Sequence, residues 1–61
     1  MTYNVDWREK VNGVYNHRWV KVEGWKNVAA VLKNLQSKDS TLETWVTDNE
    51  AYMVCEWKKA R

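Results

Sequence analysis

The chain has 61 residues, including five Trp, three Tyr and one Cys, and its formal net charge is +2. This length allows one small domain over residues 1–61, with a short basic end at residues 58–61. The mean hydropathy of −0.78 and the lack of a long apolar run exclude a membrane span, and a single cysteine excludes an intrachain disulfide.

Asn12-Gly13 predicts the first element, a β-hairpin, because a type I′ turn needs positive φ at both central residues. Pairing around this turn sets Val11 opposite Val14, and the positions of every later pair add up to 25. One face of the hairpin is then rich in valine, while the other is polar and aromatic. This segregation supports the register, since a slip of one residue would exchange the two faces.

Residues 25–36 are expected to form a helix once Gly24 has ended the hairpin. The apolar residues of this segment recur at helical spacing, which would gather them on one side. They are Trp25, Val28, Ala29, Leu32 and Leu35, with Val31 widening the stripe.

Residues 41–57 are expected to form a second hairpin, because they contain many β-branched residues and a turn signal at Asp48-Asn49. This pairing would set Trp45 opposite Tyr52 on one face. On the other face it would set Leu42, Thr44 and Val46 opposite Cys55, Met53 and Ala51.

A second helix is the alternative for this segment. Ser40-x-x-Glu43 resembles a capping box, and several apolar residues of the segment partly fit helical spacing. Asp48, Asn49 and the β-branched residues favour the hairpin.

Together these elements predict an α+β fold with the order ββαββ, in which two antiparallel hairpins form a small sheet and one helix packs on one face. The short links on either side of the helix predict that the third strand runs parallel to the second, while the strand order stays open. The expected inner residues are Val5, Trp7, Val14, Val20, Val22, Trp25, Val28, Leu32, Leu35, Leu42, Val46, Met53 and Trp57.

One helix can cover only one face, and the uncovered face is expected to carry four large aromatic residues with basic residues around them. A contiguous apolar surface of this kind indicates an interaction site, although aromatic residues on an open sheet also pair simply to stabilise it. The predicted partner-binding residues are Tyr15, Trp19, Trp45, Tyr52, Arg8, His17 and Lys21.

No signature of catalysis, metal binding or cofactor binding is present. Cys55 and His17 are too few for a zinc site, and their predicted faces set them on opposite sides of the sheet. A chain of this length also has little room for a dry pocket. We therefore expect no enzyme activity, no cofactor and no small-molecule substrate.

Two functions remain. The first is a protein-interaction module that binds a protein partner, or a second copy of itself as a homodimer, through the aromatic sheet face. The second is a single-stranded nucleic-acid-binding protein in which bases stack on the same aromatic residues. Asp6, Glu43 and Glu56 are expected on that face and would repel a phosphate backbone, so the first hypothesis is preferred.

The residues from Met1 to Asp6 lack the basic and apolar segments of a secretory signal, and a single free cysteine suits a reducing compartment. We therefore expect a cytoplasmic location. Short, Trp-rich reading frames that begin at Met are frequent in phages and mobile elements, where their products bind host proteins. On that basis we expect a complete accessory protein of this kind, acting in the host cytoplasm.

Overall fold

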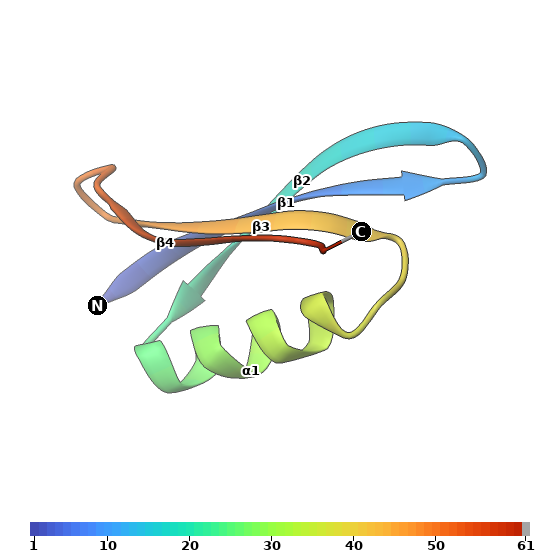
Figure 1. Cartoon of the computed structure of the whole chain (residues 1–61). Helices are drawn as coiled ribbons and strands as arrows, with labels where there is room; N and C mark the ends of the chain where they lie inside the picture. The colour runs from blue at the N-terminus through green and yellow to red at the C-terminus, as the bar shows by residue number, and fades with distance from the viewer. Residues whose placement is uncertain (61) are drawn as a thin grey trace.

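The computed structural model describes residues 1–60 and shows one four-stranded antiparallel sheet with a single helix lying along one of its faces (Figure 1). Both the predicted α+β class and the predicted ββαββ order are confirmed, and the last third of the chain is a hairpin rather than a helix. Arg61, the last residue of the predicted basic end, lies outside the described residues. The elements are β1 (Thr2–Val11), β2 (Val14–Glu23), α1 (Trp25–Gln36), β3 (Thr41–Asp48) and β4 (Met53–Lys58).

The first hairpin has the expected register along its whole length. Asn12 and Gly13 adopt φ values of 52° and 79°, as a type I′ turn requires, and Val11 lies opposite Val14. The paired positions add up to 25 from this turn to the pair of Thr2 with Glu23. The turn residues Asn12 and Gly13 therefore determine the register of β1 with β2 over ten residues of each strand.

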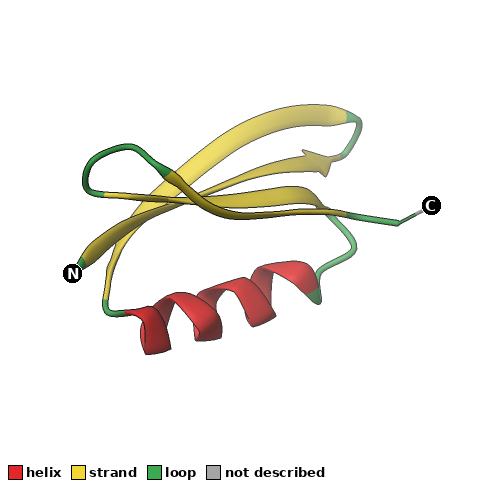
Figure 2. Cartoon of the chain, turned by 60° about the vertical axis from the view of Figure 1, so that its left-hand side comes forward, coloured by secondary structure: helices red, strands yellow, loops and turns green. Residues whose placement is uncertain are grey.

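The strand order in the sheet is β2-β1-β3-β4, so β1 lies in the interior of the sheet and β2 and β4 are the edge strands. Because β1 is antiparallel to both β2 and β3, these two strands run parallel to each other, as expected for strands joined through a helix. Figure 2 shows α1 on one side of the sheet and an uncovered surface on the other.

The register of the second hairpin differs from the expected one by four residues. Val46 lies opposite Cys55 rather than Ala51, and Trp45 lies opposite Glu56 rather than a tyrosine. Because four is an even number, Thr44, Trp45 and Val46 keep the faces predicted for them. The prediction fails at Leu42, because an irregularity in the β1–β3 ladder skips this residue and pairs the buried Thr41 with Glu9 instead.

A longer turn than expected causes this shift. The carboxylate of Asp48 accepts hydrogen bonds from the backbone N–H groups of Glu50 at 2.9 Å and Tyr52 at 3.0 Å, and Ala51 adopts a φ of 67°. The Asp48 side chain therefore supplies the hydrogen-bond acceptor for two backbone N–H groups of the turn. Residues 49–52 consequently stay out of the strands. Tyr52 therefore belongs to the turn and not to β4.

The core between sheet and helix is small. Its fully enclosed apolar side chains are Val5, Val28, Leu35 and Val46, and they are surrounded by partly buried Tyr3, Trp7, Val22, Val31, Leu32 and Cys55. Thr41 and Thr44 of β3 are buried as well. Within residues 1–60, no helix is long and apolar enough to cross a lipid bilayer.

Four residues expected in the core are exposed, namely Val14, Val20, Trp25 and Met53. A twelve-residue helix is about 18 Å long and a ten-residue strand about 33 Å, so α1 cannot cover the whole hairpin. Val14 lies at the hairpin tip and Val20 lies on the edge strand, while Trp25 makes a T-shaped contact with Tyr3 at a centroid distance of 5.5 Å. An irregularity in the β3–β4 ladder turns Met53 away from the core, opposite Thr47.

Candidate functional site

The face of the sheet that α1 leaves uncovered, called the outer face below, is built from rows of side chains that cross the four strands. Side chains alternate along each strand, so the registers bring every second residue of β1 together with its partners on β2 and β3. The central row, from β2 to β4, consists of Trp19, Asp6, Trp45 and Glu56. A carboxylate between two indole rings therefore occupies the middle of the outer face.

Asp6 is well enclosed in this row, with only 13% of its side chain exposed. Its Oδ2 atom lies 2.8 Å from Nε2 of His17, and because an ionised carboxylate only accepts hydrogen bonds, this nitrogen carries the proton. The His17 ring also lies against Trp45, with a centroid distance of 5.2 Å and an interplanar angle of 36°. His17 thus connects side chains of β1 and β3 to the edge strand β2.

The neighbouring row brings two further charged groups together. Arg8 Nε lies 3.0 Å from Glu43 Oε1, and the Glu43 side chain is only 23% exposed. The guanidinium of Arg8 and the ammonium of Lys10 lie 5.9 Å and 5.2 Å from the ring centroid of Tyr15. Cation–π contacts from β1 therefore support Tyr15 on β2.

The exposed charge of the outer face is mostly positive. Asp6 and Glu43, two of the carboxylates expected to repel a phosphate backbone, are largely covered and bound by His17 and Arg8. Lys21 makes no ion pair within the described residues. Electrostatic repulsion of an anionic ligand by this face is therefore weaker than the sequence alone indicates.

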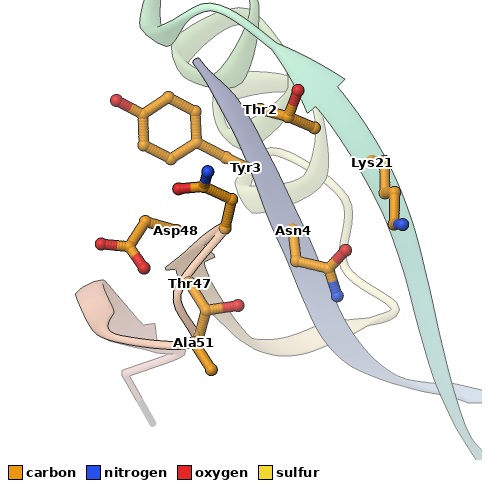
Figure 3. Close-up of a pocket in the computed structure, with 8 residues that line it drawn as sticks. Thr2, Tyr3, Asn4, Lys21, Thr47, Asp48 and Ala51 are labelled. Atoms are coloured by element: carbon orange, nitrogen blue, oxygen red, sulfur yellow. The ribbon is translucent and has the colours of Figure 1, made fainter.

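Two shallow hollows flank the central row. One has a volume of about 450 Å³ and is lined by residues that include Asn4, Lys21 and Thr47 (Figure 3). The other has a volume of about 550 Å³ and is lined in part by Arg8 and Tyr15. No buried polar side-chain atom in residues 1–60 lacks a hydrogen-bond partner, so neither hollow holds an unsatisfied group that would require a ligand.

Tyr52 lies apart from the position predicted for it. It is exposed in the β3–β4 turn instead of facing Trp45 across the sheet, because the turn takes up residues 49–52. Met53 and Val54, which follow it, are exposed too. These three exposed residues follow one another at the turn end of β4.

The registers place the other predicted partner-binding residues on the outer face: Arg8, Tyr15, His17, Trp19, Lys21 and Trp45. Asp6 and Lys10 contact members of this set but were not predicted to belong to it. The register of the first hairpin already contained the signal, because it sets Asp6 opposite Trp19 and Lys10 opposite Tyr15.

On the helix-side face, Glu9 links the two strands of the first hairpin. Trp7 Nε1 donates to its Oε1 atom at 3.2 Å, and Arg18 Nε donates to its Oε2 atom at 2.9 Å. The Arg18 guanidinium, followed by the Trp7 indole, lowers the pKa of Glu9 below its ordinary value of 4.5. This cluster supports the hairpin with polar contacts rather than with apolar packing.

Cys55 and His17 lie on opposite faces of the sheet. Cys55 packs against the core on the helix side, where burial raises the pKa of its thiol, whereas His17 lies on the outer face. Within residues 1–60, no three His, Cys, Asp or Glu side chains lie together closely enough to hold a metal ion.

Comparison with protein-family models, with curated proteins and with solved structures finds no match to this chain. Functional inference therefore depends on the geometry of the outer face and of the sheet edges.

Proposed function

We propose that this protein is a small interaction module that binds a protein partner through the outer face of its sheet. The observation that carries this proposal is the exposure of large aromatic side chains on the sheet face that α1 leaves uncovered. Trp19, at the β2 end of the central row, is 59% exposed, and Tyr15, four residues earlier on the same strand, is 61% exposed. Exposed apolar patches of this kind mark interaction sites.

Aliphatic residues favour a protein partner over other ligands. Met53 of the edge strand β4 lies opposite Thr47 and is exposed on the same face as the aromatic residues. A protein surface can bury aliphatic and aromatic side chains together, whereas nucleic-acid bases gain chiefly from stacking on aromatic rings.

Trp19 is the proposed anchor, with Tyr15 and Trp45 contributing apolar area and with Arg8, His17 and Lys21 at the rim. Trp, Tyr and Arg are the residue types that dominate the binding energy of protein interfaces. The contacts of His17 with Asp6 and Trp45 hold part of this surface in place before a partner binds, which reduces the entropy cost of association.

Single-stranded nucleic acid is a second candidate, which one observation favours. Asp6 and Glu43 are bound by neighbouring side chains, and Lys10 and Lys21 lie beside Tyr15 and Trp19. Bases could stack on these rings while the lysines attract phosphates. This mode predicts binding that weakens steeply with salt.

We propose a binding role without catalysis, because His17 is engaged with Asp6 and Trp45 and the buried Cys55 lies on the other face. A single thiol that is partly buried suits a reducing compartment, so we propose a cytoplasmic location.

The test compares quantitative affinity capture by the native chain, by Trp19→Ser and by Trp25→Ser, an exposed Trp on the helix side. The proposal predicts a protein that is retained by the native chain and by Trp25→Ser, is lost with Trp19→Ser, and survives nuclease treatment. Equal capture by Trp19→Ser would overturn it. Quenching of Trp fluorescence by oligo-dT at low salt, and its loss at high salt, would favour the second candidate instead.

A further inference from the structure

A shallow hollow crosses the outer face toward the end at which the turn joins β1 to β2. It has a volume of about 550 Å³, and residues from all four strands line it. They include Tyr15 of β2, Arg8 of β1, Leu42 and Glu43 of β3, and Lys58 of β4 with Lys59 after it. Because basic residues outnumber acidic ones in this lining, the site is called the basic hollow below.

Arg8, Glu43 and Lys58 lie side by side in the basic hollow. Glu43 is opposite Arg8 in the ladder of β1 with β3, and opposite Lys58 in the ladder of β3 with β4. Arg8 Nε lies 3.0 Å from Glu43 Oε1, whereas Lys58 makes no ion pair within residues 1–60. One carboxylate between two cations leaves an excess of positive charge.

Arg8 keeps hydrogen-bond donors for a ligand although it is paired with Glu43. A guanidinium group has five N–H donors, and a carboxylate that binds in the bidentate manner engages two of them. The Arg8 side chain is 50% exposed. Donors of Arg8 therefore remain for a second carboxylate.

Lys10 adds a further positive charge beside the basic hollow. Its ammonium lies 5.2 Å from the ring centroid of Tyr15, and it makes no ion pair in the part of the chain that the structure describes. Lys59, by contrast, is engaged, because its Nζ atom donates to the Asp39 carbonyl at 2.7 Å and lies 3.7 Å from the Asp39 carboxylate. The excess of positive charge therefore comes from Lys10 and Lys58.

We propose that the basic hollow binds carboxylate side chains of an acidic segment in the protein partner. This inference rests on the proposed function and specifies the chemistry of the partner that binds at Trp19. Tyr15 connects the two sites, because it lines the basic hollow and lies four residues from Trp19 on the same face of β2. Four residues of extended chain span about 13 Å. We therefore expect the partner to carry an apolar residue and an acidic residue at about this separation.

Two features favour carboxylates of a protein over phosphates of a nucleic acid. Leu42 and Tyr15 line the basic hollow, and they offer apolar contact to the methylene groups of a glutamate side chain. Glu56, two residues from Lys58 on the same face of β4, is exposed and makes no ion pair within residues 1–60. A phosphate backbone that continued toward Trp45 would pass this carboxylate, whereas a protein segment can present a neutral or basic residue to it.

Titration of the native chain with hexaglutamate, followed through its amide chemical shifts by NMR, tests the inference. The proposal predicts that the shifts are largest at Arg8, Tyr15 and Lys58 and small along α1. Hexaglutamine has the same length without the charge and should cause no shifts of comparable size. No shifts with hexaglutamate, equal shifts with the two peptides, or shifts spread evenly over the chain would overturn the proposal.

Two double variants with the same loss of charge separate the basic hollow from the overall charge of the chain. Lys10→Gln combined with Lys58→Gln should lower the affinity for hexaglutamate about fivefold or more, because two exposed ion pairs are lost. Lys26→Gln combined with Lys33→Gln removes two exposed lysines of α1 and should change this affinity less than about twofold. Equal losses in the two variants would overturn the proposal, because they would indicate a general attraction to a positively charged chain.

Oligo-dT of the same total charge as hexaglutamate tests the phosphate alternative. At equal salt concentration, the proposal predicts smaller shifts at Arg8 and Lys58 with oligo-dT than with hexaglutamate. Larger shifts with oligo-dT would overturn the proposal in favour of a nucleic acid.

Trp19→Ser distinguishes a failure of this inference from a failure of the proposed function. Hexaglutamate has no apolar residue, so Trp19→Ser should bind it as the native chain does, even though this variant is expected to lose the protein partner. Loss of the partner with Trp19→Ser, together with its full retention by the Lys10→Gln and Lys58→Gln double variant, would overturn this inference and leave the proposed function intact. Equal capture by Trp19→Ser overturns the proposed function, whereas the hexaglutamate titration reports on the basic hollow alone.

Discussion

Nε2 of His17 lies 2.8 Å from the carboxylate of Asp6, on the sheet face opposite α1. Asp6 is enclosed by its neighbours although it belongs to an open surface, because Trp19 and Trp45 lie on either side of it in the central row. A carboxylate in such a position needs a hydrogen-bond donor, and His17 supplies one. This contact orders the middle of the outer face.

Removing the imidazole should therefore destabilise the fold. His17→Ala leaves the enclosed Asp6 carboxylate without its donor, and we expect the free energy of unfolding to fall by about 1–3 kcal/mol. Urea denaturation followed by circular dichroism measures the effect. Lys21→Ala, on the same strand and face, is the control and should change stability by less than about 0.5 kcal/mol. An equally small effect for His17→Ala would show that water, rather than His17, satisfies the Asp6 carboxylate.

The tryptophans of the two sheet faces should differ in their effect on stability. Trp7 is partly buried against the core, so Trp7→Ser should cost about 3 kcal/mol or more. Trp19 is exposed on the outer face, so Trp19→Ser should cost less than about 1 kcal/mol while it removes partner binding. Thermal melts of both variants measure this difference in stability, and comparable melting temperatures would contradict the assignment of Trp7 and Trp19 to different faces.

The fold should lose stability in acid through Glu9. Arg18 and Trp7 lower the pKa of Glu9 in the folded state, so its contribution is present above the ordinary value of 4.5 and is lost as the pH falls through the lower folded value. Melting temperature against pH is the measurement. Glu9→Gln should flatten the acid limb of this curve more than Glu50→Gln in the β3–β4 turn, and equal curves would contradict the role of the Glu9 cluster. Some acid sensitivity should persist, because the Thr2 hydroxyl and the N-terminal ammonium also lower the pKa of Glu23.

Cys55 should react slowly in the folded protein. Burial raises the pKa of its thiol above the ordinary value of 9.0, so the nucleophilic thiolate is scarce. As the pH rises past that value, the unfolded thiol ionises first, and stability should decline. Labelling with a disulfide reagent, with and without urea, checks this. Equal labelling rates in both conditions would show that the thiol is open to solvent.

The two hairpins illustrate what a sequence can and cannot reveal about this fold. Asn12-Gly13 imposes its turn through the backbone preferences of two adjacent residues, so the register of β1 with β2 follows from local chemistry. The second turn depends on the Asp48 side chain and on an alanine, Ala51, with positive φ. Alanine gives no signal for that conformation, so the sequence predicts the turn at Asp48-Asn49, too early in the chain.

The candidate site also combines features that the local sequence predicts with features that depend on long-range contacts. Alternation along the strands predicted which residues share the outer face, because it requires only the period of a strand. The exposure of Val20 could not be predicted, since it depends on β2 lying at the edge of the sheet, and strand order is set by long-range pairing. The enclosure of Asp6 likewise requires Trp45 from β3 as a neighbour.

The strand order also has a consequence for how this chain reaches its native state. β1 is synthesised first yet occupies the interior of the sheet, so the side that will receive β3 stays vacant while β2 and α1 emerge. The first hairpin can form from near neighbours, but the core closes only when Val46 meets Val5, across a long stretch of chain. A nascent chain that stops after α1 would carry an unpaired side on both β1 and β2. Such a species is prone to aggregate. Pairing of β3 with β1 therefore lowers the tendency of the newly synthesised chain to aggregate.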